Sequence, residues 1–153
     1  MVRSASTNGT HLDANSIDTA YVVMAMKLAP GRLGATVRVE AVDLVAETNT
    51  TTGEWFLAIN PTVQGSLTFV QEPNSAVLIA RGATTNIING KGLGQIGGGQ
   101  MSQSTRSSGG QLPDAWALGC KVDTTQADTL VLGFRPGTSN ADIQGTITWR
   151  ELR

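Results

Sequence analysis

The chain has few of the residues on which most protein sites are built. Its 153 residues include one cysteine and one histidine, and only 15% are charged. A lone cysteine, Cys120, cannot form an internal disulfide, so the disulfide framework of small secreted domains is missing. A zinc site needs three or four cysteine, histidine or carboxylate ligands, and His11 and Cys120 are single representatives of the first two kinds. We therefore expect no metal site and no cofactor.

Long apolar runs and concentrated charge are also missing. No stretch approaches the ~18 apolar residues that a membrane helix needs, and the polar first residues lack the apolar centre of a signal peptide. The net charge is -1, and the 11 lysines and arginines are scattered singly. No basic face is therefore expected to attract nucleic acid. We expect a soluble protein that is made in a cytoplasm and binds neither nucleic acid nor membrane.

Turn residues and alternating apolar residues are abundant instead, and the segment from Asp128 to Arg153 shows this best. It is expected to form two strands joined by one turn, in which Pro136-Gly137 and Ser139-Asn140 supply the backbone angles that turns require. In the second strand a period of two places four residues on one dry face: Ile143, Gly145, Ile147 and Trp149.

Further strands are expected along the chain. The strand Ala20–Leu28 is apolar on both faces, which predicts that both are covered. In Gly34–Glu47 the apolar positions Val37, Val39 and Ala41 share one face, and Val42 and Leu44 then take over the apolar role, a slip of one residue that predicts a β-bulge. The remaining expected strands are Glu54–Asn60, Gly65–Gln71, Ser75–Arg81, Thr84–Asn89 and Ala115–Val122. Together these patterns predict an all-β fold, a single antiparallel β-sandwich with a jelly-roll-like arrangement.

Two segments do not fit this pattern. Residues 1–19 are polar and without periodicity, so we expect an extended N-terminal arm outside the β-sandwich domain of residues 20–153. Residues 90–111 are rich in glycine, serine and glutamine, which predicts an insert that cannot build a core.

Motifs for chemistry are weak. Residues 92–97 match the GxGxxG pattern, but glycines and serines follow where a helix should begin, which favours a loop. His11, the one histidine, lies in the expected arm, a poor support for a catalytic base. The carboxylates that could pair across strands mostly flank turns: Asp43, Glu47, Glu54, Asp114, Asp123, Asp128 and Asp142. We expect no catalytic residues and no enzyme.

The three tryptophans allow two interpretations. Trp55, Trp116 and Trp149 could form a platform on which a sugar stacks, or they could belong to the core. Trp55 and Trp149 keep in phase with aliphatic neighbours along their strands, which favours the core.

Four phrases in order resemble a family of tailed-bacteriophage virion structural proteins: 20–42, 54–61, 66–77 and 128–152. The family pattern has a segment like "LkPgR", a tryptophan strand ending in "NP", the phrase "NSAV" and a terminal "NAD…G…WREL". The matching residues here are Lys27, Leu28, Pro30, Arg32, Leu33, Trp55, Asn60, Pro61, Asn74, Ser75, Ala76, Val77, Asn140, Ala141, Asp142, Gly145, Trp149, Arg150, Glu151 and Leu152.

The resemblance implies that the protein is a component of a virion, and other features of the sequence favour one kind of component. A short chain without a fibrous repeat, with a polar arm that could reach across a neighbour, favours a capsid decoration (cement) protein. Its expected partners are the major capsid protein or, as the alternative, another virion protein, together with copies of itself, with a trimer favoured. The alternative is a receptor-binding or tail-fibre module that uses Trp116 or Tyr21 to hold a bacterial surface glycan.

Overall fold

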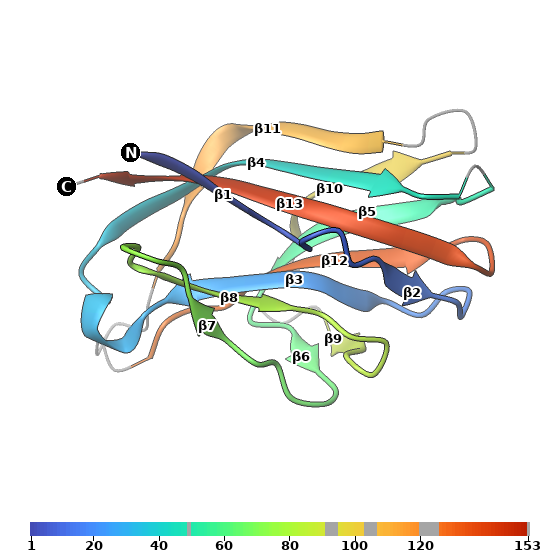
Figure 1. Cartoon of the computed structure of the whole chain (residues 1–153), viewed down its shortest axis with the longest axis horizontal. Helices are drawn as coiled ribbons and strands as arrows, with labels where there is room; N and C mark the ends of the chain where they lie inside the picture. The colour runs from blue at the N-terminus through green and yellow to red at the C-terminus, as the bar shows by residue number, and fades with distance from the viewer. Residues whose placement is uncertain (49, 91–94, 103–106, 120–125, 153) are drawn as a thin grey trace.

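The computed structural model describes residues 1–48, 50–90, 95–102, 107–119 and 126–152, and strands make up most of them (Figure 1). The strands are β1 (Val2–Ser6), β2 (Leu12–Ala14), β3 (Tyr21–Leu28), β4 (Thr36–Ala46), β5 (Gly53–Ile59), β6 (Thr62–Val63), β7 (Val70–Gln71), β8 (Val77–Arg81), β9 (Ile88–Gly90), β10 (Gln95–Met101), β11 (Ser107–Ala117), β12 (Leu130–Pro136) and β13 (Ala141–Leu152). One turn of 3₁₀ helix, Pro30–Arg32, joins β3 to β4, and these described ranges hold no α-helix. The predicted all-β fold is confirmed.

The strands form three antiparallel sheets. Sheet A has the order β1-β13-β4-β11, with β2 also paired to β13, and sheet B has the order β10-β5-β12-β3-β8-β7. A small third sheet pairs β6 with β9. Within the described part of the chain no helix is long and apolar enough to cross a membrane.

The pairing follows a nested scheme. β1 pairs with β13, β3 with β12, β4 with β11 and β5 with β10. Early strands thus pair with late strands in reverse order, as in a long hairpin that has been folded over. From β3 to β5, and again from β10 to β13, successive strands alternate between the two sheets, because β3, β5, β10 and β12 belong to sheet B while β4, β11 and β13 belong to sheet A.

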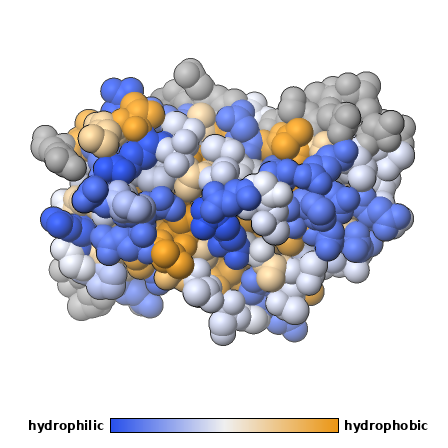
Figure 2. Space-filling view, in the orientation of Figure 1, coloured by the Kyte–Doolittle hydropathy of each residue, from blue (hydrophilic) through white to orange (hydrophobic). Residues whose placement is uncertain are grey.

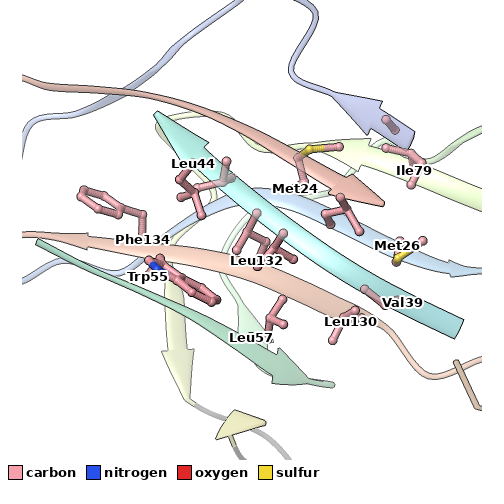
Figure 3. Close-up of a cluster of buried hydrophobic side chains, with 14 of the residues drawn as sticks. Met24, Met26, Val39, Leu44, Trp55, Leu57, Ile79, Leu130, Leu132 and Phe134 are labelled. Atoms are coloured by element: carbon pink, nitrogen blue, oxygen red, sulfur yellow. The ribbon is translucent and has the colours of Figure 1, made fainter. Parts of the chain in front are cut away.

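Both large sheets contribute side chains to one apolar core. Met24 and Leu132 of sheet B and Val39 and Leu44 of sheet A belong to one cluster of buried side chains, and all four are labelled in Figure 3. Gly145 in β13 marks how closely the sheets approach, because a Cβ there would lie 2.8 Å from Val23 Cγ1 in β3. The expected core positions of Trp55 and Trp149 are confirmed, since both side chains are buried in this cluster.

A second apolar cluster covers the other face of sheet B. Val22, Phe56 and Val131 lie in it, and Leu67 and Phe69 pack against it from outside. Strand β3 is therefore buried on both faces, as its uninterrupted apolar sequence predicts. The predicted strand Gly65–Gln71 is wrong over most of its length, because only Val70–Gln71 pairs and the preceding residues lie on this cluster.

The predicted bulge in β4 is confirmed. Ala41 pairs with Thr148 and Val39 with Trp149, so Glu40 has no counterpart in β13. The extra residue explains why burial passes from Val37 and Val39 to Val42 and Leu44.

The N-terminal segment is not the strandless arm that its polar sequence predicts. β1 pairs with β13 along its whole length, and β2 pairs with the start of β13. The prediction was wrong because backbone pairing, which requires no particular side chains, holds this segment. The buried apolar residues of the segment are two alanines and one leucine, namely Ala5, Ala14 and Leu12.

The glycine-rich insert also forms strands where the structure describes it. β10 lies against β5, with Gly99 opposite Trp55 and Gly98 opposite Phe56. A Cβ at Gly99 would lie 2.5 Å from Trp55 Nε1, so the absence of a side chain is what lets β10 approach the ring. The GxGxxG match falls partly on residues 91–94, outside the described residues, and its last glycine lies in β10 rather than before a helix.

Candidate functional site

Two phrases of the phage-protein resemblance meet at a buried carboxylate. Glu151 of β13 accepts a hydrogen bond from the Ser75 hydroxyl, and the indole nitrogen of Trp149 donates to the same oxygen at 3.1 Å. The Ser75 hydroxyl oxygen in turn accepts from the backbone N–H of Val77 at 3.1 Å. Burial opposes ionisation of Glu151, but these hydrogen bonds and the nearby charge of Arg3 outweigh it and lower its pKa.

Two arginines tie β1 to the opposite sheet. Arg3 lies with Nε 3.4 Å from the Glu151 carboxylate and donates to the carbonyls of Pro73 at 3.1 Å and Asn74 at 2.7 Å. At the other end of β1, Arg81 of β8 donates to the Ser6 carbonyl at 2.8 Å. The N-terminal strand is therefore attached to both sheets.

Three asparagines of the resemblance are turn residues. Asn60, Asn74 and Asn140 have φ values of 49°, 55° and 63°, a left-handed region that asparagine tolerates better than most residues. Asn60 also ties two chain segments together, because its side chain donates to Asp128 at 2.7 Å and accepts from Thr129 N–H at 2.8 Å. The matching phrases thus serve the architecture of the fold.

A surface feature lies next to the Glu151 network. A groove of about 620 Å³ runs between β13 and the turn before β8, with Arg32, Gln71 and Leu152 among its lining residues. Beside it the exposed apolar side chains of Val2 and Leu152 lie where the two ends of the chain meet, and we call these two the terminal apolar patch. Figure 2 shows apolar surface among hydrophilic side chains at this end of the molecule.

A second group of polar residues gathers at the opposite end of β13. Asp13 of β2 lies directly across from Asp142, and the Glu47 N–H donates to the Asp142 carbonyl at 2.9 Å. The His11 ring bridges two carboxylates, with Nδ1 2.9 Å from Glu47 and Nε2 3.1 Å from Asp13. Gln144 donates to the other oxygen of Glu47.

The facing carboxyl groups alter the acidity of Asp142. Its pKa is raised, first because the group is partly withdrawn from water and then because it shares a hydrogen bond with Asp13. The charges of Asp13 and Glu47 act in the same direction, and His11 opposes them. Two like charges directly opposite on paired strands are unfavourable, and a proton or a cation between them relieves the repulsion.

The other residues that were singled out have structural surroundings. Glu54 pairs with Arg135 at 3.0 Å, and Asp43 lies exposed on β4. Tyr21 is buried, and its hydroxyl accepts from the Ser16 N–H at 3.2 Å, which removes it from a glycan-stacking surface. The side chains of Trp116 and Asp114, and all of Cys120 and Asp123, lie outside what the structure describes.

No protein-family model, curated protein or solved structure matches this chain.

Sequence reasoning missed both groupings. The His11 cluster could have been suspected from His11-Leu12-Asp13, because a buried leucine between two exposed polar residues is the alternation of a strand. Nothing local indicates that Glu47 and Asp142 join them, or that Ser75 meets Glu151. Those contacts depend on strand register.

Proposed function

We propose that the two large sheets form a jelly-roll sandwich and that the chain is a structural protein of a tailed-bacteriophage virion. The nested pairing of early with late strands, divided between two sheets, supports the jelly roll. Viral capsid and lectin domains use this architecture, but fold analogy alone does not fix function. The phrases that resemble the pattern of the phage family supply the second support.

Within the virion we propose the role of a capsid decoration protein that oligomerises and bridges capsid subunits. The observation that carries this role is the terminal apolar patch, formed by Val2 on edge strand β1 and Leu152 at the end of the neighbouring β13. Val2 lies opposite Arg150, and Leu152 follows two residues later, so both side chains are on the outer face of sheet A. An apolar patch at an open sheet edge suits docking by apolar contact and strand addition.

The test uses undecorated capsids of the phage that encodes the chain. The full-length protein is mixed with them, and occupancy is measured by cosedimentation and electron microscopy. The double variant Val2→Ser/Leu152→Ser should bind at least about tenfold more weakly, because each lost apolar contact costs about 1 kcal/mol or more. Val70→Ser is the matched control, since Val70 is equally open but lies on β7 at the edge of sheet B.

Salt provides a further check on the same binding. With a net charge of -1 the attachment rests on apolar contacts, so raising ionic strength should change occupancy little. Equal loss of binding in the control variant would remove the patch from the proposal. Failure of the full-length protein to bind capsids, together with binding to host cells or a glycan array, would indicate the tail-fibre alternative.

A further inference from the structure

The cluster formed by His11, Asp13, Glu47 and Asp142, called here the β13 start cluster, is not explained by architecture. Unlike Glu151, none of its side chains is sequestered in the core. It brings one imidazole and three carboxylates from separate parts of the chain to one point on the outer face of sheet A. One ligand atom each from His11, Glu47 and Asp142 lies within 4.8 Å of the others.

The donor set has the chemistry of a divalent transition-metal site. Zn²⁺ takes imidazole nitrogen and carboxylate oxygen at about 2.0–2.2 Å, commonly with four ligands. An imidazole ligand favours such ions over Ca²⁺ and Mg²⁺, which prefer oxygen alone. Because the side chains are partly exposed, modest rotations can bring the three ligand atoms into bonding range.

Neighbouring side chains would also hold the ligand side chains in fixed orientations. Nδ1 of His11 faces Glu47 at 2.9 Å, which makes it the nitrogen positioned toward the ligand carboxylates. Nε2 faces Asp13 at 3.1 Å, so Asp13 can accept the remaining imidazole N–H and fix the ring. Gln144 holds Glu47 from the other side.

We propose that the β13 start cluster binds one divalent transition-metal ion of the Zn²⁺ class, with His11, Glu47 and Asp142 as ligands and Asp13 as the residue that orients His11. The ion offsets the like charges that Asp13 and Asp142 place opposite each other. It links the segment before β2, the end of β4 and the start of β13, and so stabilises the N-terminal segment on sheet A. This inference does not depend on the proposed place in a virion.

The direct test is calorimetric titration of metal-free full-length protein with ZnCl₂ at neutral pH, with CaCl₂ and MgCl₂ as comparisons. We expect one Zn²⁺ per chain in the micromolar range and much weaker binding of the other two ions. His11→Ala and Glu47→Gln should each weaken zinc binding by at least about tenfold. Glu54→Gln is the control, because its side chain is 38% exposed against 37% for Glu47 and lies outside the cluster.

The single histidine permits a second readout. His11 is the only imidazole in the chain, so its ring nitrogen resonances can be followed without ambiguity. On addition of one equivalent of ZnCl₂, the resonance of one ring nitrogen should move to the coordinated position while the other stays protonated. Circular dichroism verifies that each variant is folded. Millimolar zinc binding that the two cluster variants leave unchanged, or an imidazole spectrum unaffected by zinc, would overturn the proposal.

Discussion

The Ser75 hydroxyl donates a hydrogen bond to the carboxylate of Glu151, which follows it by 76 positions in the chain. The Glu151 side chain is only 9% exposed. Its carboxylate also accepts a hydrogen bond from Trp149 and forms an ion pair with Arg3. One ionised group thereby links the turn before β8, strand β1 and the end of β13.

Glu151→Gln should destabilise the protein by about 1.5–3 kcal/mol at neutral pH, the range for hydrogen bonds to a charged group. The folded-state pKa lies below the ordinary 4.5, so the carboxylate's contribution is complete above that value. It is lost as the pH falls through the folded-state pKa. Urea unfolding of both proteins between pH 7 and pH 3 measures this, and a difference that stays constant with pH would contradict it.

Trp149→Ala should lower the free energy of unfolding by about 3–5 kcal/mol, as for other large buried aromatic side chains. The ring is 1% exposed and lies in the common core. Trp149→Phe separates the two contributions, because it keeps much of the apolar burial but removes the N–H that Glu151 accepts. Its cost should be clearly smaller. An unchanged melting temperature for Trp149→Ala, with capsid or glycan binding lost, would make Trp149 a binding residue instead.

Gly145→Ala should destabilise by about 1–3 kcal/mol, because it forces a methyl group between the sheets. That methyl would lie 2.8 Å from Val23 Cγ1 and 3.3 Å from Leu132 Cδ2. Adding Val23→Ala makes room, so the double variant should be more stable than the sum of the single effects predicts. Gly34→Ala is the control: nothing lies within 4 Å of its added Cβ, and its stability should not fall. Chemical denaturation of the wild-type protein and of the Gly145→Ala, Val23→Ala, double and Gly34→Ala variants gives the comparison.

Removal of residues 1–19 should destabilise the domain, contrary to what a polar arm would allow. The truncated chain loses β1 and β2, the burial of Leu12 and the charge of Arg3 beside Glu151. Leu12 alone accounts for about 1.5–3 kcal/mol. Thermal unfolding followed by tryptophan fluorescence measures the effect. Ile17→Ser, which changes an exposed residue of the same segment, should leave the melting temperature unchanged. If the truncated chain were as stable as the full-length protein, the segment would be an arm that contributes nothing to the fold.

Patterns in the sequence predicted the structural features that are determined by residues close together along the chain. The slip after Ala41 indicated a bulge in β4, which the structure has at Glu40, and the phase of Trp55 and Trp149 placed both rings in the core. Periodicity cannot show which strand is a partner. β12 and β13 follow each other across one turn, yet they belong to different sheets.

The segments that were missed are those whose strands owe little to apolar side chains. The inward-facing side chains of β1 are those of Arg3 and Ala5. In β10 three consecutive glycines lie opposite β5. Backbone hydrogen bonds hold both, and composition gives no sign of them. The β13 start cluster was missed for a related reason: Asp13 and Asp142 are 129 positions apart (142 − 13), and only the register of β2 on β13 brings them together.

The position of β13 at the centre of sheet A also has a consequence for biosynthesis. β1, β2 and β4 all hydrogen-bond to this strand, so sheet A cannot assemble until β13 has been translated. Until then the emerging chain carries open strand edges, which are prone to wrong pairing with other chains. Closing contacts between such distant segments is slow. The protein should therefore depend on protection by a chaperone during synthesis more than a domain built from local hairpins.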